Sequence, residues 1–448
     1  MSFRRLRTNI LYLWIATLPG SSLVFGQETR GTPAADVAPV LKQARKAPPL
    51  PPREGRAVPA STVSALQQAV MGARPGDTIL VADGNYMLER TLLFDGKQHV
   101  TLRSASGDPA KVTLRGGGGW RGPTDDYRTI ASEDLVTIRR SEDIIIAHLT
   151  FAEVRHYGIK IGIDADHNPP NPSNIHIYDC HFRNIATRAV KGVAMADRKP
   201  VVGGSVRFCD FENTGIPDPS WAWALYEGNY VSAIDMMYLK DWTFSDNVFR
   251  NIKGASGGGR GAIFVWNQSR NITVERNLFI GCDRAIAFGN PSKPTGYQPG
   301  TLHVYDGVIR NNFIVVGTSP KAVGTKGIEI VWTDNVQVYH NTVYAADPRC
   351  RAIHYFQDIH RLHLANNLVR GRLEGEGDVR AEGNVVGDLE GYFVNPLEGD
   401  LHLTERAAEA LGMGVPRAAV TDDFDGQKRA DPPDIGADER VWRSRAKR

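Results

Sequence analysis

Short hydrophobic segments recur along the chain, separated by stretches rich in Gly, Asn and Asp. In seven of them a small residue is followed by Ile or Val, then by a variable residue, and usually by another hydrophobic one. They span residues 157–161, 188–192, 232–236, 261–265, 284–288, 326–330 and 351–355. Because side chains alternate between the two faces of a strand, we expect the Ile and Val positions to stack inward and the residues on either side to point outward.

A second strand-like segment follows each of these, for example at residues 242–249, 271–279 and 336–343. Aligning the second segments gives one column, which contains Cys180, Cys209, Asn247, Asn277, Asn312, Asn341 and Asn367. Asn tolerates left-handed backbone, and its amide can bond the same atoms one rung away. The pattern predicts an all-β fold, a single-stranded right-handed parallel β-helix. A β-propeller would need four antiparallel strands in each longer repeat, which the short spacings disfavour.

The two ends of the chain have a different character. Arg4, Arg5 and Arg7 precede an apolar stretch at residues 10–18, which predicts a signal peptide over 1–26. That stretch is shorter than the roughly 20 residues of a membrane-spanning helix, so we expect cleavage, no transmembrane segment afterwards, and a secreted or periplasmic protein.

Four regions are expected along the chain. After the signal peptide, a Pro- and Ala-rich linker covers 27–60, the β-helix covers 61–405, and a partly irregular C-terminal segment covers 406–448. An amphipathic helix at residues 64–73 is predicted to cap the open end of the first coil.

Composition and charge limit the kinds of molecule that the protein is expected to bind. The 448 residues include 45 Gly and are 42% hydrophobic, which is typical of a turn-rich globular protein rather than a helical one. The net charge of +3 is too small, and no basic run is dense enough, to indicate nucleic-acid binding. The four cysteines match no zinc-binding spacing, so no structural metal is predicted from them.

Several stretches resemble known families. The sequence PGDTILVADGNY at residues 75–86, followed by VTLRSASGDPAKVTLRG at 100–116, is similar to the opening coils of the chondroitinase B and alginate lyase family. NITVERNLF at 271–279 and NVQVYHNTVY at 335–344 resemble the wider pectate-lyase-like superfamily. Residues 423–426 and 433–439 resemble a tail common on exported bacterial β-helix proteins. The resemblance implies the fold and a polysaccharide substrate, and it carries over no catalytic residue.

The outward positions supply the candidate catalytic residues. The residues after the inward Ile or Val form one ladder: Lys160, Lys191, Asp235, Phe264, Ala287, Glu329 and His354. Two ammonium groups one rung apart would lower each other's pKa, so Lys160 or Lys191 could act as a base. Arg188, two positions before its inward Val, could neutralise a uronate carboxylate, whereas Asp235 would hold Lys191 protonated. A solvated polar face with ion pairs between rungs is an equally good interpretation of these residues.

Further residues could bind the substrate. Six lie on or near the same face: Arg207, Arg260, Arg284, Lys326, Glu329 and His354. An insertion at 216–230 adds four aromatic residues that could stack on sugar rings or form a small core of their own: Trp221, Trp223, Tyr226 and Tyr230. The sequence indicates no definite cofactor, although Asp164, Asp166 and Asn168 could form a Ca²⁺ site. A polar loop without metal is the preferred interpretation of that cluster.

These features favour a lyase that cleaves an anionic, uronic-acid polysaccharide by β-elimination. The alternatives are a glycoside hydrolase or uronate epimerase on the same scaffold, or a non-catalytic carbohydrate-binding protein. A hydrolase pair of Asp235 and Glu329 is disfavoured, because three rungs separate them by roughly 14 Å. Glycosidase carboxylates lie roughly 5 to 9.5 Å apart.

Overall fold

The computed structural model describes most of the chain from the linker onward. The described residues are 46–51, 54–116, 134–162, 171–192, 199–217, 228–318 and 324–440. The expected signal peptide, the expected Ca²⁺ loop and three of the four aromatic residues of the insertion lie outside them. Among the described residues, no helix is long and apolar enough to cross a membrane.

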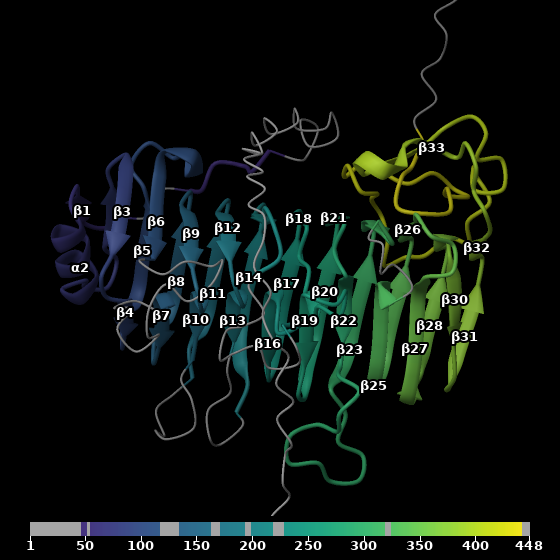
Figure 1. Ribbon diagram of the computed structural model, residues 1–448, viewed down its shortest axis with the longest axis horizontal. Helices are drawn as coiled ribbons and strands as arrows, with labels where there is room; N and C mark the ends of the chain where they lie inside the picture. The colour runs from purple at the N-terminus through teal and green to yellow at the C-terminus, as the bar shows by residue number, and fades with distance from the viewer. Residues whose placement is uncertain are drawn as a thin grey trace, which may run out of the picture. The chain divides into compact units, whose positions relative to one another are not determined.

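Each coil of the fold contributes one strand to each of three parallel stacks (Figure 1). One coil contains β16 (Ser232–Met237), β17 (Leu239–Ser245) and β18 (Val248–Arg250), and the next contains β19 (Gly261–Trp266), β20 (Ser269–Glu275) and β21 (Leu278–Ile280). β16 pairs with β19, β17 with β20 and β18 with β21, all parallel and in register. This confirms the predicted right-handed parallel β-helix.

The remaining strands extend the same three stacks. The first stack adds β4 (Leu92–Asp95), β7 (Asp134–Arg139), β10 (Tyr157–Ile161), β13 (Arg188–Gly192), β22 (Arg284–Phe288), β25 (Lys326–Tyr339), β27 (Arg351–His360) and β30 (Arg372–Gly375). The second adds β1 (Ala57–Ala60), β2 (Thr78–Val81), β5 (Gln98–Ser104), β8 (Glu142–Ala147), β11 (Ser173–Tyr178), β14 (Val201–Arg207), β23 (Val304–Arg310), β28 (Leu362–Ala365) and β31 (Val379–Glu382). The third adds β3 (Gly84–Leu88), β6 (Val112–Gly116), β9 (Thr150–Val154), β12 (His181–Ile185), β15 (Asp210–Glu212), β24 (Phe313–Val316), β26 (Thr342–Ala345), β29 (Leu368–Arg370) and β32 (Val385–Val386). β25 runs through the first and second stacks, and so joins them into one sheet.

The core follows the predicted columns. The inward Ile and Val residues pair in register on consecutive rungs and are fully buried: Ile159, Val190, Ile234, Ile263, Ile286, Ile328 and Ile353. The third stack adds a column of phenylalanine rings whose centroids lie 4.6 to 5.1 Å apart and whose planes are nearly parallel: Phe151, Phe182, Phe211, Phe249 and Phe279. Stacked rings of this kind contribute about 0.5–1.5 kcal/mol per pair beyond the area they bury.

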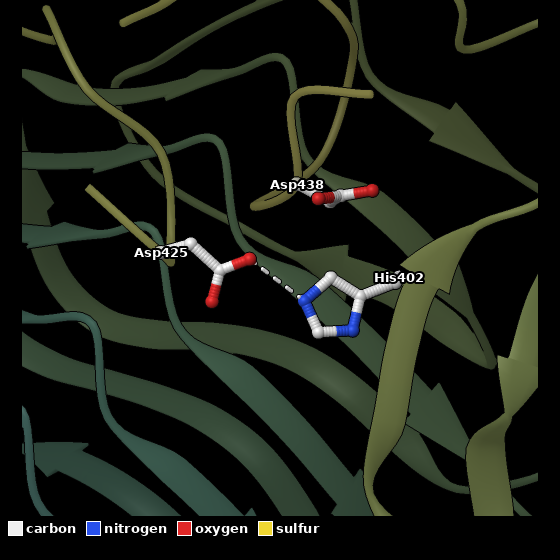
Figure 2. A group of neighbouring side chains, drawn as sticks. All are labelled: His402, Asp425 and Asp438. Carbon is white, nitrogen blue, oxygen red and sulfur yellow. Dashed lines mark hydrogen bonds and ion pairs between the residues drawn. The ribbon is translucent and has the colours of Figure 1, made fainter. Parts of the chain in front are cut away.

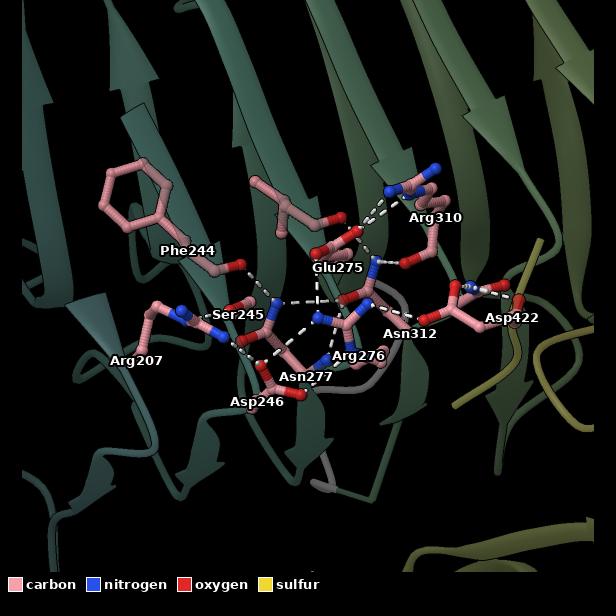
Figure 3. Close-up of polar contacts among 12 residues, drawn as sticks. Arg207, Phe244, Ser245, Asp246, Glu275, Arg276, Asn277, Arg310, Asn312 and Asp422 are labelled. Atoms are coloured by element: carbon pink, nitrogen blue, oxygen red, sulfur yellow. Dashed lines mark hydrogen bonds and ion pairs between the residues drawn. The ribbon is translucent and has the colours of Figure 1, made fainter. Parts of the chain in front are cut away.

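The predicted asparagine column is a buried hydrogen-bond ladder at the turn between the second and third stacks (Figure 3). The side-chain oxygen of Asn277 accepts from the backbone N–H and the amide of Asn247, at 3.0 and 2.9 Å. Asn277 in turn donates to Asn312 Oδ1 at 3.0 Å and to the carbonyl of Phe244 at 3.0 Å. The same bonds repeat down the coils to Asn384, which the sequence alignment did not include.

The first coil is capped by the predicted helix. α2 (Val63–Met71) begins after Thr62, whose hydroxyl accepts from the backbone N–H of Ala65 at 3.1 Å. Such an N-cap satisfies one of the helix's unpaired donors. Leu66 and Val70 are buried against the end of the core, so the helix covers apolar surface that no further coil reaches.

The boundaries of the β-helix differ from those expected. β1 pairs with β2, so the coils begin at residue 57 rather than 61, and the last strand of the stacks ends at 386 rather than 405. Residues 393–403 form an antiparallel hairpin, β33 (Phe393–Asn395) and β34 (Asp400–Leu403), with alternating hydrophobic residues that resemble one more coil in the sequence. The described residues also include two 3₁₀ turns, η1 (Pro109–Lys111) and η4 (Pro396–Glu398).

The C-terminal segment, residues 387–440, packs on the outer side of the third stack. Leu401, Leu403 and Ile435 belong to one buried cluster with outward residues of the stack such as Leu278 and Phe313. Ion pairs extend the contact, because Arg276 Nη1 lies 3.1 Å from Asp422 Oδ2 (Figure 3). The segment is therefore part of the folded unit and covers apolar surface of the coils.

Candidate functional site

The small residue of the repeated motif explains why charged side chains gather outside the first stack. A Cβ on Gly158 would lie 3.2 Å from the ring of Phe182, so this position faces the inner phenylalanine column. Ala189, at the same position of the next rung, is likewise in the core beside Val190. Two consecutive residues thus face inward, and the residues on either side of the pair project outward together.

Arg188, Lys191 and Asp235 form one ion-paired group, called here the Asp235 cluster. Arg188 Nε donates to Asp235 Oδ2 at 2.6 Å, and Lys191 Nζ lies 3.1 Å from Asp235 Oδ1. Trp266 Nε1 donates to the same Oδ1 at 3.0 Å. Burial alone would raise the pKa of Asp235, but the charges of Lys191 and Arg188 lower it to about 2. The carboxylate is therefore ionised at neutral pH, and both of its oxygens already have partners in Arg188, Lys191 and Trp266.

The expectation of a solvent-exposed ladder is wrong for this cluster. The side chains of Arg188, Lys191 and Asp235 are 0%, 4% and 1% exposed. The ring of Tyr230, from the expected aromatic insertion, covers the Arg188 guanidinium with 3.7 Å between its carbon and the ring centroid. Lys191 is enclosed with Asp235 and only 4% exposed, so it is poorly placed to reach a proton of a bound polysaccharide. Within the described residues, Arg188 Nη2 makes no hydrogen bond.

A second ion-paired group, the Glu329 cluster, lies further along the same stack. Arg284 Nη1 is 2.9 Å from Glu329 Oε1, and Lys326 contacts the other carboxylate oxygen. Glu329 is fully buried, whereas Arg284 and Lys326 are each 14% exposed. Burial, followed by the charges of Arg284 and Arg351, lowers the pKa of Lys326 to about 7, and the contact with Glu329 acts in the opposite direction.

His354 is the next residue of the ladder after Glu329. Burial and the nearby charges of Lys326 and Arg351 lower the pKa of His354 to about 4, so its imidazole is neutral at pH 7. The ring stacks on Phe356 with centroids 4.5 Å apart, and its Nδ1 makes no hydrogen bond within the described residues. His354 could therefore offer a neutral nitrogen to a bound ligand.

A column of cations runs along the Glu329 cluster. Arg284, Lys326, Arg351 and Arg372 occupy the same register position on four consecutive rungs. Glu374 is the carboxylate nearest the last two, 2.9 Å from Arg351 Nε and 3.4 Å from Arg372 Nη1. Arg351 begins one of the seven repeated segments but was not predicted as a site residue, and Arg372 was missed because β30 lacks the repeated motif.

The other expected binding residues are scattered. Arg207 ends β14 in the second stack, where it donates to Ser245 Oγ at 3.0 Å, and so it does not join the Asp235 cluster (Figure 3). Arg260 precedes β19, and its carbonyl accepts from Arg284 at 3.1 Å. Lys160 is half-buried on β10, with its ammonium 5.9 Å from the centroid of Tyr157. Trp221, Trp223 and Tyr226 lie outside the described residues.

The two carboxylates considered for a hydrolase are both committed to ion pairs. Asp235 and Glu329 are on β16 and β25, with β19 and β22 between them in the stack. Each is buried and bonded to two cations. A glycosidase needs one protonated and one ionised carboxyl group facing the same bond, which this arrangement does not provide.

No protein-family model and no curated relative matches the chain. Among solved structures it is similar to an alginate lyase from Paenibacillus sp. str. FPU-7, with 10% identity and a TM-score of 0.39 over 73% of this chain and 99% of that one. It is also similar to a mannuronic acid specific polysaccharide family 6 lyase from human gut microbiota, with 13% identity and a TM-score of 0.42 over 74% of this chain and 82% of that one. A third similar structure is the tailspike protein of E. coli bacteriophage HK620 in complex with a pentasaccharide. It has 12% identity and a TM-score of 0.39 over 74% of this chain and 59% of that one. Values this low carry no argument about the reaction or ligand of this chain.

Proposed function

We propose that the protein is an exported lyase that cleaves a uronic-acid polysaccharide along the outer face of the first stack. The observation that carries this proposal is the column of four cations, Arg284, Lys326, Arg351 and Arg372, which pair with the carboxylates of Glu329 and Glu374. Rungs of a β-sheet are about 4.8 Å apart, so the column offers regularly spaced positive charge. A linear polymer with a carboxylate on each sugar suits such a surface.

β-Elimination needs a cation at the uronate carboxylate and a base at the neighbouring carbon. Neutralising the carboxylate makes the adjacent proton removable, and the base takes that proton. The electron pair left behind forms the double bond and expels the glycosidic oxygen, which takes up a proton from solvent. Arg351, which is 43% exposed, can reach a carboxylate in solvent more readily than the buried Arg188. Lys326 is the better-placed base, since it is partly exposed and its pKa is lowered toward neutrality, whereas Lys191 is buried against Asp235.

The test is an ultraviolet absorbance screen on the purified mature protein. Alginate, pectate, chondroitin and heparin would be supplied with and without Ca²⁺, because elimination creates a conjugated double bond that absorbs without a label. We expect one anionic glycan to respond, and Lys326→Ala to slow that response about 10²–10⁴-fold. Lys240→Ala, an exposed lysine on the second stack, is the matched control and should not change the rate.

Any of the following results would contradict the proposed lyase activity. New reducing ends without absorbance would indicate hydrolysis, and an altered uronate composition without cleavage would indicate an epimerase. Binding of a glycan without any turnover would favour the second candidate, a non-catalytic carbohydrate-binding protein. The observation that favours this second candidate is that Lys191, Arg188 and Lys326 are all ion-paired. Export itself is tested by N-terminal sequencing of protein from the periplasm and the culture medium.

A further inference from the structure

A histidine in the C-terminal segment, His402, lies beside Asp425 and Asp438, which come from two other stretches of the chain (Figure 2). His402 on β34 places Nδ1 2.6 Å from Asp400 Oδ1 and Nε2 2.9 Å from Asp425 Oδ2. Asp438 approaches from the last turn of the segment. One ligand atom from each of His402, Asp425 and Asp438 lies within 4.8 Å of the others. These residues belong to none of the clusters on the first stack.

One histidine ring faces three carboxylates in this group. Asp438 is only 4% exposed, and its Oδ2 accepts from the backbone N–H of Leu403 at 2.8 Å. Its second oxygen makes no hydrogen bond within the described part of the chain.

Neighbouring carboxylates repel one another, and a cation bound between them would offset that repulsion. We propose that His402 Nε2, Asp425 and Asp438 bind one divalent first-row transition ion, of which Zn²⁺ is the best match. An imidazole nitrogen with carboxylate oxygens suits Zn²⁺, whereas Ca²⁺ and Mg²⁺ prefer sites made of oxygen alone.

The surroundings of the ring fit a metal ligand. Metal-binding histidines usually donate their second N–H to a carboxylate, which fixes the tautomer and the ring orientation. Asp400 occupies that position at Nδ1, so Nε2 is directed toward Asp425 and Asp438. The edge of the ring also packs on Phe313 of the third stack, with centroids 5.2 Å apart and planes at 87°. The proposed site is therefore held rigidly before the ion binds.

The role that follows is structural. The ligands come from β34, from the turn at residues 423–426 and from the turn at 433–439, and an ion would tie these three stretches together over the third stack. Binding to the folded state alone stabilises it by mass action, by about 2.7 kcal/mol when free ion is at 100 times the Kd. The ion would hold the C-terminal segment on the coils, and this proposal is independent of the proposed lyase activity.

The experiment is calorimetric titration of the full mature chain, stripped with a chelator, with ZnCl₂ and separately with CaCl₂. We expect one Zn²⁺ per chain, a higher Tm, and proton release that appears as a dependence of the heat on the buffer, because the ligand nitrogen must lose its proton. Asp400→Asn should weaken the affinity about 10–100-fold. His402→Gln and Asp438→Asn should remove the single-site isotherm.

The matched control is His148→Gln, because His148 forms another His–Asp pair, 2.7 Å from Asp179, without a third carboxylate in reach among the described residues. It should bind Zn²⁺ as the parent does. The proposal is overturned if the parent binds no Zn²⁺, if it binds Ca²⁺ instead, or if His402→Gln binds as tightly as the parent. Should His402→Gln fail to fold, Asp400→Asn, which keeps all three proposed ligands, supplies the test, and an unchanged Zn²⁺ affinity in that variant would overturn the proposal.

Discussion

Replacing Asn277 by Ala tests whether the asparagine ladder holds the coils together. The side chain makes four hydrogen bonds: it accepts from the N–H and the amide of Asn247, and it donates to Phe244 O and to Asn312 Oδ1. All of them are buried, so water cannot replace the lost partners without entering the core. Removing the amide also leaves the backbone N–H of Asn247 without its acceptor.

The expected loss follows from these bonds. A buried hydrogen bond contributes about 1 kcal/mol net, and an orphaned donor costs about 1–3 kcal/mol. Four bonds therefore give a loss of about 3–5 kcal/mol in the free energy of unfolding. Asn277→Asp should destabilise at least as much, because its new oxygen would face the oxygens of Phe244 and Asn312. Asn384→Ala, at the partly exposed end of the ladder, should cost only about 1–2 kcal/mol.

Equilibrium unfolding in urea, followed by far-ultraviolet circular dichroism and by tryptophan fluorescence, measures these differences. The midpoints are comparable where the two probes coincide and the m-value is unchanged. A loss below 1 kcal/mol for Asn277→Ala, or equal losses at Asn277 and Asn384, would refute the reasoning. Either result would mean that the coils are held by the apolar columns and that the ladder only fills the turn.

Three further predictions concern charge and packing. Asp235→Asn should cost about 3–5 kcal/mol at pH 7, because it leaves two buried cations unpaired. Since the folded pKa of Asp235 is depressed to about 2, this contribution is present above pH 4 and is lost as the pH falls toward 2, which urea titrations across that range would follow. Arg276→Met removes the ion pair to Asp422 of the C-terminal segment, so limited proteolysis with mass spectrometry should show faster cleavage there. Gly204→Ala would place a Cβ 2.5 Å from the Trp242 ring and should lower Tm, unlike Gly387→Ala, whose nearest neighbour is 3.9 Å away.

The parts of the fold that repeat could be predicted from the sequence. The inward Ile and Val positions and the asparagine column recur with the same neighbours on every rung, so each coil supplies the same evidence again. The helix at Val63–Met71 was predictable for a local reason, since Thr62 caps it and its apolar face has helical spacing. The role of the small residue before each Ile or Val was not, because it depends on the phenylalanine column of another stack.

The candidate site was predicted only in part, because its properties depend on burial. The sequence placed Arg188, Lys191 and Asp235 on neighbouring rungs, and they are together. The sequence did not reveal that Tyr230 covers the arginine, nor that Glu329 would be fully buried. The His402 group was missed because its ligands are separated by 36 positions and belong to a segment without a repeat, where no periodicity places one residue beside another.

The buried ion pairs distinguish the correct strand register from a shifted one, which the repeated apolar core does only weakly. The Ile and Val columns present similar apolar side chains on every rung, so they alone discriminate weakly against a slip of two residues between neighbouring strands. The same slip would carry Asp235 about 6.6 Å along the strand from Arg188 and Lys191, at about 3.3 Å per residue. Both cations and the carboxylate would then be buried and unpaired, at a cost of several kcal/mol. We infer that the Asp235 cluster holds the register of β13 on β16, and that Asp235→Asn should weaken this pairing before the more distant rungs unfold. Hydrogen exchange at Val190 and Ile234, compared with Ile328, tests that order directly.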